Sequence, residues 1–293
     1  MAKPESRTLD EIVALYRLEP QLQDIYVEGN KDRSFIEWFL HVQGLRDVVV
    51  KDIGCVDVPA EMVLARKLED NQRGRVITLA YFLEDSFGLA LPSVSCIADG
   101  DFDHINSRNH NATLLLLTDY TSPELYFFNA DSLTKLLKLA LSSFPKTAQK
   151  VMEEIRPVLE DLFVVRMANA SLGWGLQEVK FERSCRIVET GIEFDLGGYI
   201  ARYLQANNQY GRKDEFVGAI RICKARLTGE PRIQIHGHDY VRLLAWYIRQ
   251  HKGFKAVRDD VVERALFASA ESSQLMSEKL FQALLKRFQV SER

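Results

Sequence analysis

The stretch that decides the fold is Leu22-Gln23-Asp24-Ile25-Tyr26-Val27-Glu28-Gly29-Asn30. Its residues up to Val27 favour an extended strand, and Glu28-Gly29 predicts a turn where the strand ends. Asn30 can cap a following helix, because its side chain can accept a hydrogen bond from an amide of the first turn. The apolar residues of that helix recur at helical spacing, at Phe35, Ile36, Phe39 and Leu40. The segment therefore predicts a strand, a turn and a helix.

The alternation of strands and helices continues to about residue 145. The further elements are a strand at 48–50, a helical region at 59–87 broken near Gly74, and strands at 94–98 and 112–117. Such alternation favours a mainly parallel sheet with helices on both faces and a ligand site beyond the carboxyl ends of the strands. We therefore expect an α/β, Rossmann-like domain over residues 20–145, with Glu28, Asp99 and Thr118 at strand ends.

Helices dominate the rest of the chain, residues 146–293. Residues 124–143 also predict a helix, and Pro145 marks a boundary after it. One stretch, 178–194, alternates in part and predicts a hairpin. We expect a second, mostly helical domain that serves substrate binding and dimerisation.

Length and composition are those of an ordinary globular protein. With 293 residues, of which 46% are hydrophobic, the chain can bury a core without disulfides. Its cysteines lie tens of residues apart, as is typical of reduced thiols rather than of a metal site or a disulfide framework. Residues 1–10 lack a signal-peptide pattern, and no stretch is apolar enough to cross a bilayer. We expect a cytoplasmic protein without a membrane partner.

Charge is distributed unevenly along the chain. Up to Pro145 there are 14 Lys and Arg against 22 Asp and Glu, and after it 24 against 19. An acidic part suits divalent cations and a basic part suits phosphate polyanions, although solvated surfaces of uneven sign would look the same.

Acidic residues gather where two predicted strands end. Asp99, Asp101 and Asp103 alternate, so an extended backbone would point their carboxylates the same way, and their mutual repulsion calls for a cation such as Mg²⁺ or Mn²⁺. Glu28 adds a carboxylate from another strand end, as a metal ligand or as a proton acceptor for the attacking water. Loop aspartates of this kind are also common in turns, but their placement together favours a metal site.

Three segments resemble motifs of a known family. Residues 25–35 (Ile-Tyr-Val-Glu-Gly-Asn-Lys-Asp-Arg-Ser-Phe) resemble the first motif of TOPRIM domains, and 97–103 (Ile-Ala-Asp-Gly-Asp-Phe-Asp) their D-x-D motif. Residues 118–126 are similar to the T-x-x-x-S-x-E run of stand-alone TOPRIM proteins related to the overcoming-lysogenisation-defect nucleases. The resemblance covers about residues 20–145.

The resemblance implies a Mg²⁺-dependent nuclease that cleaves tRNA as a homodimer. It also implies a toxic effector of an anti-phage defence system, held inactive by an ATPase partner. By position, Glu28 matches the essential glutamate of the family, Asp99 and Asp101 the metal-binding pair, and Glu124 an additional acid. Asp103 is compatible with metal binding or with a capping role.

Candidate substrate contacts are basic residues and one histidine. Lys31 lies in the first motif, and Arg212, Lys213 and Arg242 belong to a basic, tyrosine-rich stretch that could contact phosphates and stack bases. His238 belongs to a Gly-His-Asp element similar to one in the same TOPRIM group, whose Asp239 we expect to cap a helix. The alternative is a solvated basic helix face with aromatic residues in the core.

Two further functions remain open from the sequence. The chain could cleave DNA, since TOPRIM sites also serve DNA enzymes, or it could be an inactive TOPRIM module that docks on an ATPase. No Walker motif is present, so ATPase activity would come from a partner chain.

Overall fold

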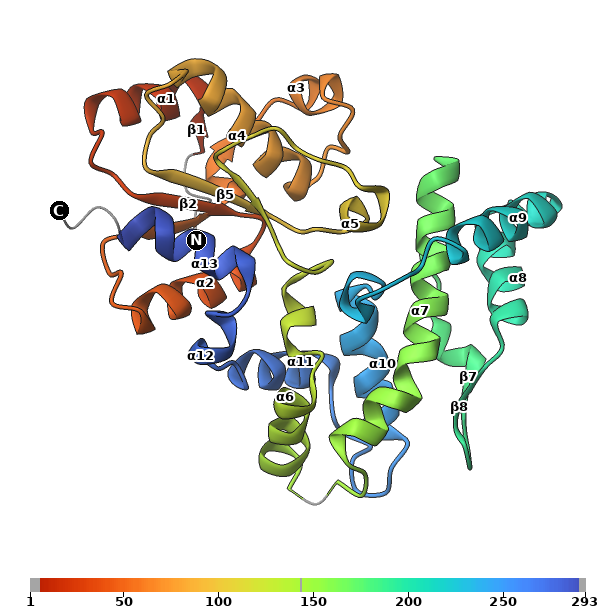
Figure 1. Cartoon of the computed structure of the whole chain (residues 1–293). Helices are drawn as coiled ribbons and strands as arrows, with labels where there is room; N and C mark the ends of the chain where they lie inside the picture. The colour runs from red at the N-terminus through yellow and green to blue at the C-terminus, as the bar shows by residue number, and fades with distance from the viewer. Residues whose placement is uncertain (1–5, 143, 290–293) are drawn as a thin grey trace. The chain divides into compact units, whose positions relative to one another are not determined.

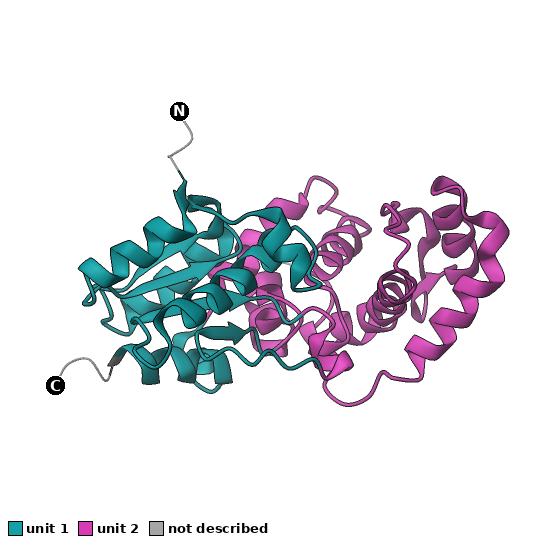
Figure 2. Cartoon of the chain, turned by 90° about the horizontal axis from the view of Figure 1, so that it is seen from above, with its two compact units in different colours: residues 1–100, 108–119, 271–293 teal, residues 101–107, 120–270 magenta. Residues whose placement is uncertain are grey.

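The computed structural model describes residues 6–142 and 144–289. The chain forms two compact units, which are coloured separately in Figure 2. Unit 1 consists of Met1–Gly100, Arg108–Asp119 and Glu271–Arg293, and unit 2 of Asp101–Ser107 and Tyr120–Ala270.

Unit 1 is built on a four-stranded parallel sheet. Its strands lie in the order β3 (Val49–Asp52), β2 (Asp24–Val27), β5 (Val94–Ala98) and β6 (Leu115–Leu117). All three neighbouring pairs are parallel. A separate short parallel pair joins β1 (Arg7–Thr8) to β4 (Val56–Asp57). The expectation of an α/β fold with a parallel sheet flanked by helices is confirmed.

Helices cover both faces of this sheet (Figure 1). On one face, α1 (Leu9–Leu18) and α4 (Gln72–Phe87) share a core with the sheet residues Tyr26, Cys96 and Ala98. On the other face lie α2 (Asn30–Val42) and α13 (Lys279–Gln289). The central strands β2 and β5 are covered on both faces, which explains why they consist of continuous buried runs.

The predicted helical region 59–87 is interrupted earlier than expected. It forms α3 (Ala60–Ala65) and α4, and Gly74 lies in the first turn of α4 rather than at the break. A Cβ at Gly74 would come within 2.1 Å of the Glu69 carbonyl oxygen and 2.9 Å of Val63 Cγ1. Gly74 is therefore required because the first turn of α4 packs closely against α3 and the segment that follows it, not because a turn separates two helices there.

The region 124–143, predicted to be helical, is helical over most of its described length, but it does not form one continuous helix. The chain forms a short 3₁₀ helix at Pro123–Phe127, then α6 (Ala130–Lys135), which continues into a π-helical turn at Leu136–Ala140. The Asn129 side chain caps α6 by accepting a hydrogen bond of 2.9 Å from the Ser132 amide, which starts a new helix there. Position 143 lies outside the described residues.

Unit 2 is mainly helical, as expected for this region. Its longest helix, α7 (Ala148–Leu172), packs against α6, α9 (Lys213–Lys224) and α10 (Gly237–Arg249). The predicted hairpin is confirmed as β7 (Cys185–Val188) and β8 (Gly191–Phe194), which pair antiparallel. The remaining helices are α5 (Asp103–Asn106), α8 (Leu196–Ala206) and α11 (Asp259–Ala268) in this unit, and α12 (Ser272–Leu275) in unit 1.

Over the described part of the chain, no helix combines the length and the apolar composition that crossing a bilayer requires.

The last helix returns to the first sheet. In α13, Phe281 packs edge-on against Phe39 with ring centroids 4.6 Å apart. Arg287 donates hydrogen bonds to the Val94 carbonyl at 3.0 Å and to Ser95 Oγ at 2.8 Å. The two compact units therefore do not follow the boundary expected at residue 145, because unit 1 includes the C-terminal helix.

Asp119 fixes the start of α13, and its removal is expected to destabilise unit 1. Its two carboxylate oxygens accept hydrogen bonds of 3.0 Å from the Lys279 and Leu280 amides. We predict that Asp119→Ala lowers the free energy of unfolding by ~1 kcal/mol, because the amides lose a charged acceptor. Urea unfolding measures this, with Asp119→Asn as the control that keeps an acceptor. Equal urea midpoints for Asp119→Ala and the wild type would contradict the capping role.

Candidate metal and catalytic site

Glu28 and Asp99 lie where two neighbouring strands of the sheet end. Glu28 directly follows β2 and Asp99 directly follows β5, and these strands are paired. From β2 the chain connects to β3 on one side of it, whereas β5 and β6 lie on the other side. Ligands of open parallel sheets bind at such a reversal of strand order, beyond the carboxyl ends of the strands.

A hydrogen bond joins these two strand ends. The Asp99 amide donates to Glu28 Oε1 at 2.8 Å. Arg73 Nε donates to the Asp99 carbonyl at 2.8 Å, and the Gly100 amide donates to Thr118 Oγ1 at 2.8 Å. These three hydrogen bonds fix the turn after β5, and with it the direction of the Glu28 carboxylate and the path of the backbone at Asp99.

The start of α2 adjoins Glu28. The residue that caps this helix is Gly29, not Asn30 as predicted, and the Gly29 amide donates to Asp32 Oδ2 at 3.0 Å. Lys31 is exposed in the first turn. A Cβ at Gly29 would meet only Asp32 Oδ2, at an ordinary 3.6 Å, so packing does not require a glycine there.

Asp101 and Asp103 belong to unit 2 and do not continue the strand. Asp101 has a φ of +42°, a left-handed conformation that Asp tolerates better than most residues, and its amide donates to the Thr121 carbonyl at 2.9 Å. Asp103 is buried as the first residue of α5. The expectation of an extended aspartate run is therefore wrong, because the chain turns at Asp101.

Glu124 lies against the N-terminus of α10 within unit 2. Its carboxylate is buried, and Ser122 Oγ donates to Oε2 at 2.6 Å. A Cβ at Gly237 would stand 2.4 Å from Glu124 Oε2 and 2.1 Å from Ser122 Oγ. Only glycine fits at this position, and the helix dipole favours the carboxylate there. The role of Gly237 was missed from the sequence, where only the Gly-His-Asp element pointed to it.

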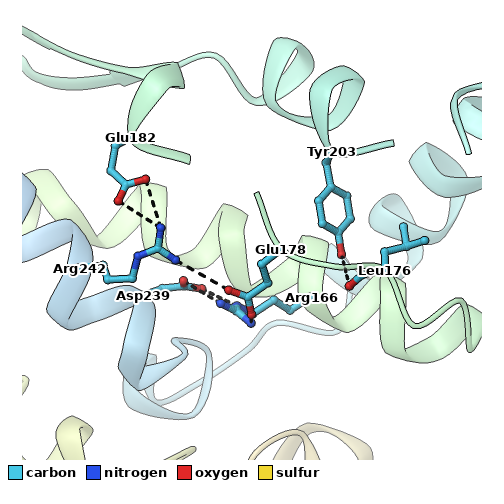
Figure 3. Close-up of polar contacts among 7 residues, drawn as sticks. All are labelled: Arg166, Leu176, Glu178, Glu182, Tyr203, Asp239 and Arg242. Atoms are coloured by element: carbon cyan, nitrogen blue, oxygen red, sulfur yellow. Dashed lines mark hydrogen bonds and ion pairs between the residues drawn. The ribbon is translucent and has the colours of Figure 1, made fainter. Parts of the chain in front are cut away.

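Asp239 does not cap α10, contrary to prediction. The capping residue is His236, and the Asp239 carboxylate accepts hydrogen bonds from Arg166 Nε at 2.5 Å and Nη2 at 2.9 Å (Figure 3). Asp239 is buried, so the positive charge and the two N–H donors of the Arg166 guanidinium stabilise its carboxylate better than backbone amides would. His238 is exposed at the start of α10.

Two of the three predicted basic substrate contacts in unit 2 are paired with carboxylates. Arg242 Nη2 lies 3.1 Å from Glu182 Oε1, and Arg212 Nη2 lies 2.9 Å from Glu215 Oε1. The third, Lys213, lies above an aromatic ring, with Nζ 5.9 Å from the ring centre of Tyr210. Phosphate binding by Arg212 or Arg242 would compete with an existing ion pair.

His236 is expected to make unit 2 less stable in mild acid. Burial lowers the pKa of His236 to about 3 from an ordinary 6.5, with Arg166 acting in the same direction. The folded state therefore binds a proton at His236 only at a lower pH than the unfolded state does. The free energy of unfolding is at its full value above about pH 6.5 and declines below it, by at most ~1.4 kcal/mol per pH unit. We predict that His236→Phe, which cannot titrate, shows a smaller decline in urea unfolding between pH 7.5 and 5. Parallel declines would contradict the prediction.

The carboxylates at the strand ends fit a hard divalent cation. Within residues 6–142 and 144–289, no three His, Cys, Asp or Glu side chains are grouped closely enough to hold a metal ion by themselves. Mg²⁺ commonly takes only one or two carboxylates and completes its shell with water and substrate phosphates. Glu28 and Asp99, which supply oxygen ligands on neighbouring strand ends, match that pattern.

No protein-family model matches the chain, and no curated protein matches its sequence.

Proposed function

We propose that the chain is a Mg²⁺-dependent (or Mn²⁺-dependent) endonuclease of the TOPRIM type. The proposal is carried by one observation, the hydrogen bond between the Asp99 amide and the Glu28 carboxylate at the reversal of strand order. Glu28 and Asp99 are the proposed core of the metal site. The metal-binding roles of Asp101 and Asp103, and the catalytic role of Glu124, stay predictions.

The chemistry divides between the cation and the chain. A bound Mg²⁺ would polarise the scissile phosphodiester and make the attacking water more acidic. The Glu28 carboxylate, oriented by the Asp99 amide, would accept the proton of that water as the water oxygen bonds to phosphorus. The P–O bond to the leaving ester oxygen breaks, and that oxygen takes a proton from solvent. The N-terminal end of α2, which begins two residues after Glu28, offers a favourable seat for a phosphate oxygen.

We further propose that the substrate is tRNA and that cleavage is toxic to the cell. The support is the resemblance of residues 118–126 to stand-alone TOPRIM nucleases, a group that includes AriB, the effector of the PARIS anti-phage system. An AriA-like ATPase would hold the chain inactive until infection is sensed, and the released chain would act as a homodimer in the cytoplasm.

The test compares matched nucleic acids. Purified full-length chain is incubated with tRNA and with DNA of the same sequence, each in Mg²⁺ or in EDTA. The proposal predicts cleavage of tRNA in Mg²⁺ only. Cleavage of DNA alone would refute tRNA as the substrate but would still agree with the proposed metal site. If both nucleic acids stay intact and Mg²⁺ does not change the melting temperature of the chain, the nuclease is refuted and an inactive module that docks on an ATPase is the better proposal.

A further inference from the structure

A hollow in unit 2 has no role in the proposed catalytic site. It has a volume of about 530 Å³ and lies between the segment before β7 and the helix α8. Its lining includes Lys180, Arg183, Arg202 and Gln205, with one acid, Glu178. The volume falls within the range of nucleotide-sized ligand sites and is far larger than a single phosphate needs.

The three cations of the hollow carry charges that no carboxylate neutralises. Among the described residues, Lys180, Arg183 and Arg202 form no ion pair. Arg202 donates to the neutral hydroxyl of Ser184. Other arginines nearby in the sequence are paired, such as Arg186 with Glu193 at 2.6 Å. Unpaired cations that share a concave surface are poised to bind an anion.

The one acid of the hollow is already engaged. Glu178 accepts a hydrogen bond from Arg166, and its other carboxylate oxygen lies 3.8 Å from Arg242 Nη1 (Figure 3). Arg166 and Arg242 also pair with Asp239 and Glu182. The two arginines and the three acids of this cluster together carry a net charge of −1. Adding the three cations of the hollow gives these eight side chains a net charge of +2.

The backbone that carries two of the cations is fixed in place. Lys180 and Arg183 flank Phe181, whose ring is buried under the Arg242 guanidinium at 4.8 Å. Glu182 is bonded to Arg242, and the Ser184 carbonyl accepts a hydrogen bond of 2.9 Å from the Asp195 amide. A backbone held in this way loses little conformational freedom when a ligand binds.

We propose that this hollow binds the phosphates of a nucleic-acid strand. Arginine forks match phosphate oxygens, and a hollow of this size with three separate cations accommodates a phosphate with its attached nucleoside rather than an isolated ion. The inference deepens the proposed function and rests on it only in naming a nucleic acid as the occupant. It assigns strand binding to Lys180, Arg183 and Arg202, which none of the sequence motifs contains.

The test measures binding without cleavage. Labelled single-stranded RNA and DNA of one sequence are titrated with the full chain in EDTA, by fluorescence anisotropy, over a range of salt concentrations. The variant is Lys180→Gln/Arg183→Gln. The control is Lys252→Gln/Lys255→Gln, which removes the same charge from exposed lysines that do not line the hollow.

The variant is expected to bind about tenfold more weakly, with a salt slope (log K against log salt) shallower by about 1.4 for the two lost phosphate contacts. The control should bind as the wild type does, and both should melt as the wild type does. Whichever of the two, RNA or DNA, binds more tightly is the kind of strand that the hollow prefers. Inorganic phosphate should compete only weakly.

The two proposals fail separately. If Lys180→Gln/Arg183→Gln binds RNA and DNA with the affinity and the salt slope of the wild type, strand binding by the hollow is refuted and the nuclease proposal stands. A wild-type chain that binds through the hollow in EDTA but cuts nothing in Mg²⁺ refutes the nuclease and keeps the hollow.

Discussion

Glu28→Gln is expected to lower the initial rate of Mg²⁺-dependent tRNA cleavage by about 10³-fold or more. The carboxamide has the same shape, and its oxygen can still accept the hydrogen bond from the Asp99 amide, so the strand ends keep their geometry. It loses the negative charge that attracts the cation and the basicity that accepts a proton. Time courses of tRNA cleavage measure the rate, and the melting temperature reports the fold.

The control for this substitution is Glu37→Gln. Glu37 is exposed on α2, the helix that follows Glu28, and forms only a loose ion pair with Arg33 at 3.8 Å. It loses the same charge in a place where no catalytic role is proposed, so its cleavage rate should equal that of the wild type. If folded Glu28→Gln cleaves as fast as Glu37→Gln, Glu28 is not catalytic.

Arg166→Met should cause the largest loss of stability in unit 2. Asp239 is only 2% exposed and accepts two hydrogen bonds from Arg166. Without the guanidinium, a carboxylate is left buried and unpaired, which costs about 3–5 kcal/mol. The free energy of unfolding, from urea titration followed by tryptophan fluorescence, measures the loss.

The double variant Arg166→Met/Asp239→Leu separates the ion pair from simple packing. It removes both charges, so it should recover most of the stability that the single variant loses. Burial alone raises the pKa of Asp239, and Arg166 holds it below its ordinary 3.8 in the wild type. In the single variant the raised pKa makes the deficit smaller at pH 4 than at pH 7. A double variant as unstable as the single one would contradict the unpaired-charge account.

The sheet and one half of the site could be predicted from local sequence. The strands β2 and β5 are continuous buried runs, each followed at once by an acid, Glu28 or Asp99. Parallel strands bring their carboxyl ends to one edge, so strand prediction alone placed both residues at that edge. Their hydrogen bond then needed only that the two strands be neighbours.

The turn at Asp101 could not be predicted in the same way. Its left-handed conformation accompanies a hydrogen bond to the Thr121 carbonyl, twenty residues later. The segment is held within unit 2 by Phe102, which packs against Phe163 at 5.2 Å, and by Arg226, which donates to Asn106 Oδ1 at 2.9 Å. These partners are distant in sequence, and no local pattern announces them.

Two further features also depend on distant pairs. Gly237 is required by Glu124 and Ser122, more than a hundred residues earlier, and Asp239 is bound by Arg166 rather than by its own helix. A local rule assigned Asp239 to capping because Asp is one of the preferred N-cap residues. The tertiary ion pair overrides that rule.

The position of a bound cation on the chain can be measured directly. Fe²⁺ can replace Mg²⁺ at oxygen-ligand sites, and with ascorbate and peroxide it cleaves the nearby polypeptide backbone, so the fragments map the site by mass spectrometry. If Glu28 and Asp99 hold the cation, the cuts lie next to these two residues and disappear with excess Mg²⁺ and in Glu28→Gln. Cuts confined to other segments, or cuts at these positions that persist in Glu28→Gln, would contradict this assignment.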